Sequence, residues 1–119
     1  MPHSSQITQD MRECMALCME CHTTCLETAT HCLMMGGDHA SPEHQRLLQD
    51  CAQACVVHAD FMARISEYHH DLSDVCAAIC KACAEDCERL AGEDETMRRC
   101  ADVCRRCQQS CEQMARATV

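Results

Sequence analysis

The sequence is poor in the residues from which protein cores are ordinarily built. Its 119 residues include no Trp, one Phe and one Tyr, and Leu, Ile and Val together number only 15. Cysteine alone also numbers 15, and there are nine Met. Such a chain is disordered, cross-linked by disulfides, or folded around a core of sulfur-containing side chains. The length predicts a single domain over 1–119.

Other absences exclude several function classes. Only 10 Lys and Arg oppose 19 Asp and Glu, a formal net charge of −9, whereas nucleic-acid binding needs a basic face. No run of about 18 apolar residues is present to span a membrane. Residues 1–6 lack the charged and apolar stretches of a secretory signal. We therefore expect a cytoplasmic protein with reduced thiols, and an odd cysteine count agrees because complete internal pairing is impossible.

Long helices are favoured because only three Gly and two Pro interrupt the chain. Ser41 followed by Pro42 is typical of a helix start, and Asp94 is suited to cap another helix. The predicted helices cover 8–35, 42–67, 73–91 and 94–116, separated by Gly36-Gly37, a turn over 68–73 and Gly92. Short connections between long helices predict an all-α, antiparallel, up-down-up-down four-helix bundle.

A repeated cysteine spacing places sulfur on one face of each predicted helix. Steps of four, three and four residues occur in three sets: Cys14, Cys18, Cys21, Cys25; Cys76, Cys80, Cys83, Cys87; and Cys100, Cys104, Cys107, Cys111. The second helix repeats the spacing with Cys51, Cys55, His58 and Met62, and extension of the registers adds Cys32, Met35, His44, Met97 and Met114. These steps keep side chains on one helical face, so we expect a cysteine-lined core.

A lining of this kind suits metal ions better than disulfides. Neighbouring positions on one helical face have Cβ atoms about 5–6 Å apart, whereas a disulfide needs about 3.5–4.5 Å. Each thiolate brings a negative charge that is costly in a core. One monovalent ion per thiolate neutralises this charge, whereas a zinc ion bound by four thiolates leaves a net charge of −2 at the site. Soft thiolate and thioether ligands favour Cu(I), and 15 thiols indicate storage of many ions, with proton release on loading.

The C-x3-C-x2-C-x3-C runs, above all Cys76–Cys83 and Cys100–Cys107, resemble those of the bacterial four-helix-bundle copper storage proteins, over essentially the whole chain. The chain resembles the cytosolic branch of this family, whose members lack an export signal. The resemblance implies a homotetramer of bundles, each filled with Cu(I) on paired thiolates and loaded through one open end that carries His and Met. Here that end would hold His31, Met34, Met35, His39, His44 and Met97. The connection 90–96 departs from the relatives by having no His.

The candidate copper ligands are the 15 cysteines together with Met35, His44, His58 and Met97. His58 either binds metal or forms a hydrogen bond in the core. Methionine at the end opposite the open one is more typical of gap filling: Met11, Met62 and Met114. Four further histidines are expected in loops or facing solvent: His3, His22, His69 and His70. The expected partners are copper ions and a copper chaperone or acceptor protein, with no nucleic acid and no membrane.

Four other interpretations account for part of the pattern. Cysteine serves as a small core hydrophobe in many proteins, but 15 in register are too many for that role. A C-x3-C-x2-C motif also binds [4Fe–4S] clusters in radical enzymes, yet the chain lacks strands for a catalytic barrel. Disulfide-linked helical hairpins require an oxidising compartment. Zinc buffering, as in metallothioneins, is the main alternative. No nucleophile–base set indicates an enzyme.

Overall fold

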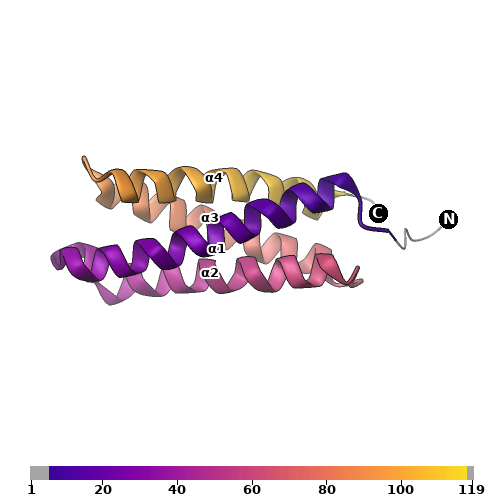
Figure 1. Ribbon diagram of the computed structural model, residues 1–119, viewed down its shortest axis with the longest axis horizontal. Helices are drawn as coiled ribbons and strands as arrows, with labels where there is room; N and C mark the ends of the chain where they lie inside the picture. The colour runs from indigo at the N-terminus through magenta and orange to yellow at the C-terminus, as the bar shows by residue number, and fades with distance from the viewer. Residues whose placement is uncertain (1–5, 118–119) are drawn as a thin grey trace.

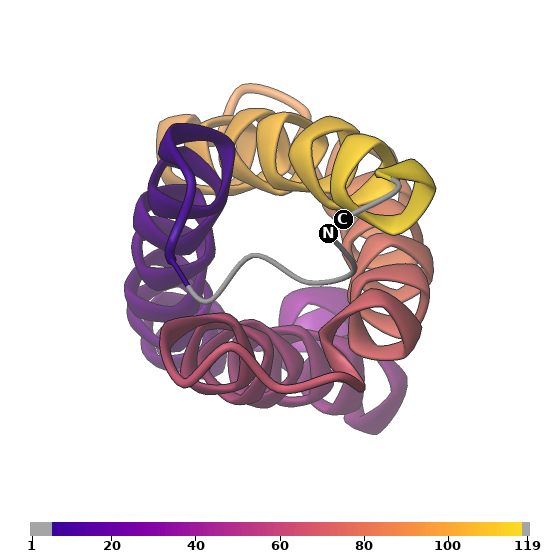
Figure 2. The same cartoon turned by 90° about the vertical axis from the view of Figure 1, so that its right-hand side faces the viewer.

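The computed structural model describes residues 6–117 and has the form of an elongated bundle of 54 × 18 × 17 Å. Its helices are α1 (Gln9–Met35), η1 (Gly37–Ala40, a 3-10 helix), α2 (Pro42–Ala63), α3 (His69–Ala91) and α4 (Glu95–Arg116). The four α-helices lie along the long axis (Figure 1). Viewed from the end, each packs against two neighbours in the cyclic order α1, α2, α3, α4 (Figure 2). The predicted four-helix bundle is confirmed.

The helix starts follow from local capping. The Ser41 Oγ accepts a hydrogen bond from the His44 N–H at 3.3 Å, and the Asp94 Oδ1 accepts one from the Met97 N–H at 3.0 Å. Each bond satisfies a backbone donor that the first helical turn leaves free. Gly36 ends α1 with φ of +75°, a conformation that glycine adopts without steric cost. No helix in the described part of the chain is long and apolar enough to cross a membrane.

The connection between α2 and α3 lies earlier than the sequence predicts. The turn was expected over 68–73, but it occupies 64–68, and α3 already begins at His69. The N–H groups of Ile65 and Ser66 donate to the carbonyls of Met62 and Phe61, each at 3.0 Å. This is the paired bonding of a Schellman helix end. Ile65 takes the left-handed conformation, φ +54°, that glycine ordinarily supplies, so no glycine marks this turn in the sequence.

The core between the helices is made of sulfur and alanine. All 15 cysteines are buried and free. Among the described residues, Leu48 and Val103 are the only buried aliphatic side chains larger than alanine. The buried polar side chains are Thr24, Thr28, His44, His58, His69 and Ser73. No Lys, Arg, Asp or Glu of the described residues is buried, so the interior carries no fixed ionic group.

Candidate metal centre

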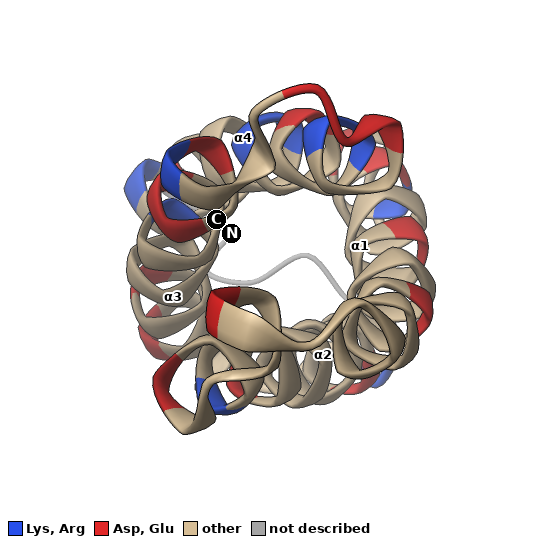
Figure 3. Ribbon diagram, turned by 90° about the vertical axis from the view of Figure 1, so that its left-hand side faces the viewer, with Lys and Arg blue, Asp and Glu red and all other residues tan. Residues whose placement is uncertain are grey.

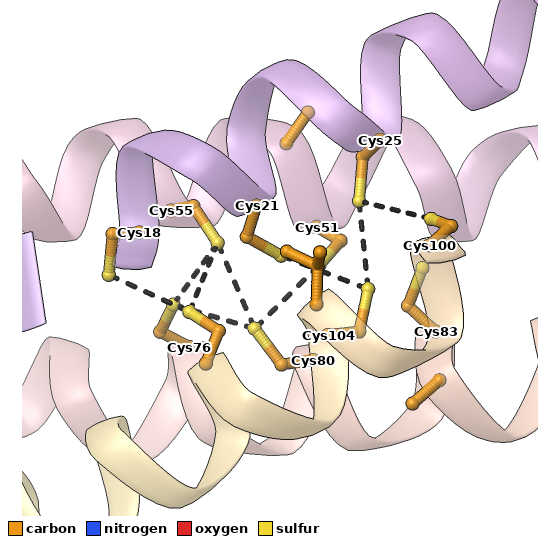
Figure 4. Close-up of a cluster of buried hydrophobic side chains, with 14 of the residues drawn as sticks. Cys18, Cys21, Cys25, Cys51, Cys55, Cys76, Cys80, Cys83, Cys100 and Cys104 are labelled. Atoms are coloured by element: carbon orange, nitrogen blue, oxygen red, sulfur yellow. Dashed lines mark hydrogen bonds between the residues drawn. The ribbon is translucent and has the colours of Figure 1, made fainter. Parts of the chain in front are cut away.

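The cysteines of neighbouring helices face one another along the bundle axis (Figure 4). The Cys21 Sγ lies 3.7 Å from the Cys51 Sγ and 3.8 Å from the Cys104 Sγ. The Cys55 Sγ lies 3.8 Å from the Cys76 and Cys80 sulfurs. These are contacts between separate thiols, since a disulfide bond is about 2.05 Å long. With a metal–sulfur bond of about 2.3 Å, the zinc–thiolate value, such gaps give S–metal–S angles of roughly 105–120°, which suit three or four ligands.

Four groups of ligand atoms are close enough to hold an ion, with all atoms of a group within 4.8 Å of one another. The groups are Cys14/Cys18/His58/Cys111, Cys18/Cys55/Cys76/Cys107, Cys21/Cys51/Cys55/Cys80 and Cys21/Cys25/Cys51/Cys104. Consecutive groups share a member: Cys18, then Cys55, then Cys21 with Cys51. The groups therefore form one connected series, in which an ion can pass from one set to the next without leaving sulfur.

His58 ends this series at one end of the bundle. Its Nδ1 lies 3.4 Å from the Cys18 Sγ and 3.6 Å from the Cys111 Sγ, and its Nε2 lies 2.7 Å from the Ser73 Oγ. The Ser73 hydroxyl donates its one hydrogen to the His69 carbonyl at 2.8 Å. Its oxygen must then accept from the His58 Nε2–H. The Nδ1 lone pair is left facing two sulfurs, as in a metal-ligating histidine with an oriented partner.

A second mixed cluster lies at the opposite end. The Cys32 Sγ is 3.1 Å from the Met97 Sδ and 3.4 Å from the His44 Nε2, and none of the three side chains is more than 1% exposed. The His44 Nδ1–H donates to the Asp86 Oδ2 at 2.7 Å, and Arg89 pairs with the other carboxylate oxygen at 2.6 Å. The carboxylate thus fixes the tautomer that presents Nε2 to the sulfurs. We call this end the His44 end (Figure 3) and the other the His69 end (Figure 2).

The electrostatics of the core favour neutral ligand sets. Burial raises the pKa of the Cys32 thiol to about 11. Hydrogen bonds from Cys111 and Cys18 lower the pKa of Cys14 to about 3, while hydrogen bonds with Cys107 and Cys14 raise that of Cys111. A thiolate in this core is therefore stabilised by neighbouring S–H groups and not by a buried cation. Several thiolates together need a compensating positive charge for each.

Comparison with known proteins decides the family. Residues 7–116 match the copper storage protein family. The chain belongs to this family. A crystal structure of a protein from Nitrosospira multiformis is 40% identical with a TM-score of 0.84, covering 90% of this chain and 95% of that one. The role of this family is storage and not catalysis. A comparison with curated proteins found no match to the sequence.

Two further relatives of known structure were determined with copper. The cytosolic copper storage protein of Streptomyces lividans, in a structure with five coppers, is 29% identical over 92% of this chain and 94% of that one, with a TM-score of 0.80. The Cu(I)-bound copper storage protein BsCsp3 is 28% identical over 90% of this chain and 99% of that one, with a TM-score of 0.83. The likeness thus extends over about nine-tenths of this chain.

At the His44 end, the copper storage fold brings together only some of the residues predicted there. Cys32, His44 and Met97 meet in the core, but Met34 and Met35 are 83% and 56% exposed. The expectation that Met35 lies on the core face is wrong, because α1 ends at this residue, beyond Cys32. The remaining two predicted residues, His31 and His39, lie near this end: the His31 Nε2 is 2.7 Å from the Asp94 Oδ2, and the His39 Nδ1 is buried with no hydrogen-bond partner among the described residues.

The prediction that four histidines face solvent or lie in loops is also corrected for the three that the structure describes. His69 is buried, because α3 begins four residues earlier than expected. His22 and His70 are half-buried and donate from Nδ1 to the carbonyls of Ala52 and Met114 at 2.8 and 2.9 Å. His3 lies outside the described residues.

Two positioning residues of the clusters were missed by the sequence reasoning, Ser73 and Asp86. Stepping back from Cys76 by three and then four residues gives Ser73 and His69, so the spacing itself placed both on the core face. Asp86 carries no such signal, because it lies beside Cys87 and meets His44 only through the pairing of α2 with α3.

Proposed function

We propose that this chain stores several Cu(I) ions on the thiolates that line its bundle. The connected series of four ligand groups, in a core without a buried carboxylate or ammonium among the described residues, carries the proposal. Each Cu(I) that replaces a thiol proton leaves the charge of the interior unchanged, however many ions are bound in this way. Zinc fits the sulfur spacing equally well, but four-thiolate zinc sites would accumulate two negative charges each. Copper in the structures of the S. lividans protein and BsCsp3 supports the same choice.

The proposed ligands are the 15 cysteines with three side chains at the two ends of the core, His44, His58 and Met97. His58 extends the cysteine series at the His69 end, where its Nδ1 faces two sulfurs. Met35 is exposed, so its proposed role is limited to capturing copper at the mouth of the His44 end.

We place copper uptake at the His44 end. Cys32, His44 and Met97 offer one ligand each of three kinds, and Asp86 holds the imidazole in its metal-binding tautomer. Acidic residues lie along the α3–α4 connection at this end (Figure 3), and their charge attracts a cation from solution. From Cys32, copper would move to the cysteines beyond it by thiolate exchange, in which one sulfur binds as another leaves.

Storage is tested by anaerobic titration of the reduced protein with Cu(I) against a chromogenic chelator, with Zn(II) in a parallel series. Several tightly held Cu(I) per chain, approaching one per thiol, are expected. Zinc binding near one quarter of the thiols, with no greater capacity for Cu(I), would instead establish zinc buffering. Because the thiols are counted in the same sample, incomplete reduction cannot imitate either result.

The place of uptake is tested by the rate at which copper passes from the chelator to the protein. We expect His44→Ala with Met97→Leu to slow this transfer by about tenfold, since the change removes two ligands of the first site. The matched control is His22→Ala with Met19→Leu, which alters the same residue types on α1 outside the sulfur core. Equal rates in the two double variants would show that copper does not enter at the His44 end.

The family likeness also supports a cytoplasmic homotetramer that exchanges copper with a chaperone or acceptor protein. Met19, Leu26 and Leu33 recur every seven residues on α1 and are 42%, 40% and 59% exposed, which gives that helix an apolar outer stripe. Such stripes are typical of subunit contacts. Analytical ultracentrifugation of the protein should give four chains per particle, and Leu26→Glu with Leu33→Glu should give smaller species. A monomeric wild-type protein would exclude the tetramer.

A further inference from the structure

A layer of soft side chains closes the core at the His69 end, with one member from each helix. The layer consists of Met11 from α1, Met62 from α2, His69 from α3 and Met114 from α4. Their exposed fractions are 6%, 0%, 6% and 5%. Three thioethers and an imidazole are a ligand set of the type that soft metal ions select. We call these four residues the Met/His layer.

The Met/His layer stands one helical turn outside the His58 group. Met11 precedes Cys14 by three residues, and Met114 follows Cys111 by three. Met62 follows His58 by four residues, and on α3 His69 precedes by four the Ser73 that orients His58. Side chains three or four apart lie on the same helical face, one turn or about 5.4 Å along the axis. Copper in this layer would therefore be next to the first group of the cysteine series.

The layer is reached from outside through a cavity of about 400 Å³ between α1 and α4, which Met11, His69 and Met114 help to line. The carboxylates of Asp10 and Glu13 line the same cavity, as does the guanidinium of Arg106, which is paired with Glu20 and Asp102. The His69 Nδ1 is buried and has no hydrogen-bond partner among the described residues. A buried polar atom left without a partner is destabilising. A metal ion bound at this nitrogen would satisfy it.

We propose that Met11, Met62, His69 and Met114 form a second site for Cu(I), opposite the His44 end. This proposal rests on the storage function proposed above and adds to it a route at the other end of the core. The site contains no thiolate, so a bound Cu(I) keeps its positive charge, and binding is weaker than at the cysteines. Weak binding next to stronger groups suits a transient site, from which copper passes to His58 and its sulfurs. Asp10 and Glu13 favour the approach of a cation.

The direct test uses the full-length reduced protein, with 13C in the methionine methyl groups and 15N in the histidines, titrated anaerobically with Cu(I). The methyl signals of Met11, Met62 and Met114 and the Nδ1 signal of His69 should shift as copper is added. The exposed Met19 serves as the internal control, and its signal should not shift. Unchanged methyl and Nδ1 signals up to one Cu(I) per thiol would overturn the site.

A thiol-reagent assay on the same samples separates this proposal from the storage function. If copper protects the thiols while the Met/His layer does not respond, the second site is refuted and storage stands. If the layer responds while the thiols stay reactive, the second site stands and storage is refuted. If neither responds, both are refuted.

A variant tests whether the site transfers copper inward. Met11→Leu, Met62→Leu and Met114→Leu keep the side-chain volume and remove the sulfur, a change that cores tolerate well. The background is His44→Ala with Met97→Leu, which disables the other end. In this background we expect transfer from the chelator to slow by about tenfold, equivalent to ~1.4 kcal/mol, relative to the control variant Met15→Leu with Met19→Leu. Equal rates in two folded variants would show that the layer only packs the core, and should the variant not fold, the labelled wild-type protein decides.

Discussion

Cys55 is the position at which loss of one sulfur should disturb copper storage most. Its Sγ lies 3.8 Å from the Cys76 and Cys80 sulfurs and 3.9 Å from the Cys107 sulfur. It belongs to two of the four ligand groups and is the only member that joins them. Cys83 is equally buried but belongs to none of the four groups. Cys55→Ala and Cys83→Ala therefore remove the same atom from the same kind of environment while differing in connectivity.

The expected magnitudes follow from this difference. Each variant loses one thiol of 15, so thiol count alone predicts the same small fall in capacity. The shared position predicts that Cys55→Ala loses more tightly held Cu(I) than Cys83→Ala, because the change leaves two groups with three ligands, whereas Cys83 belongs to none. Deleting one buried sulfur resembles deleting a methylene, about 1 kcal/mol in the free energy of unfolding. Both apo-proteins should melt about 4 °C below the wild type.

The assay is anaerobic competition with a chromogenic Cu(I) chelator, with thiols counted in each sample and thermal unfolding of the apo-proteins followed by circular dichroism. The unfolding data ensure that a loss of capacity is not a loss of fold. Equal capacities in the two variants, with intact helices in both, would show that the groups are not coupled through Cys55. The connected series would then have no role in storage.

Three further results are expected. Asp86→Asn should weaken the first copper site by about 10–100-fold in chelator competition, because the amide no longer fixes the His44 tautomer. Since burial raises the pKa of Cys32 to about 11, copper must displace a proton there at neutral pH. The apparent affinity of that site should rise about tenfold per pH unit below this pKa, and loading should release protons measurable by pH-stat. Asp94→Ala should lower stability to urea by about 1 kcal/mol at pH 7, because the cap of α4 is lost. The His31 hydrogen bond lowers the pKa of Asp94, so its contribution is present above the unfolded-state pKa and lost as the pH falls through the folded-state value; a pH-independent deficit would contradict this cause.

The helix starts and the sulfur core could be predicted because each depends on local signals. Ser41 with Pro42 and Asp94 are residues whose chemistry acts within one helical turn, and the structure confirms both caps. The spacing of four and three residues fixes a face regardless of what packs against it. The start of α3 could not be predicted in this way. Its preceding turn depends on Ile65 in a left-handed conformation, which no glycine or other local signal in the sequence marks.

The candidate site was predictable by side-chain type but not by partner. The register placed Cys32, His44 and Met97 on core faces, yet only helix pairing brings their three ligand atoms together. The same pairing supplies Asp86 from α3. Met35 shows the limit of extending a register, because the rule gives a direction around the helix and not the point at which the neighbouring helices end.

The absence of buried charged side chains among the described residues has a consequence for recognition. If each incoming Cu(I) takes the place of one proton, the net charge and the outer surface of the molecule are the same whether it is empty or full. A partner that touches only the flanks of the bundle cannot gauge how much metal lies within. A protein that responds to the copper content must therefore detect it at the two ends of the bundle, where the first and last ligands lie.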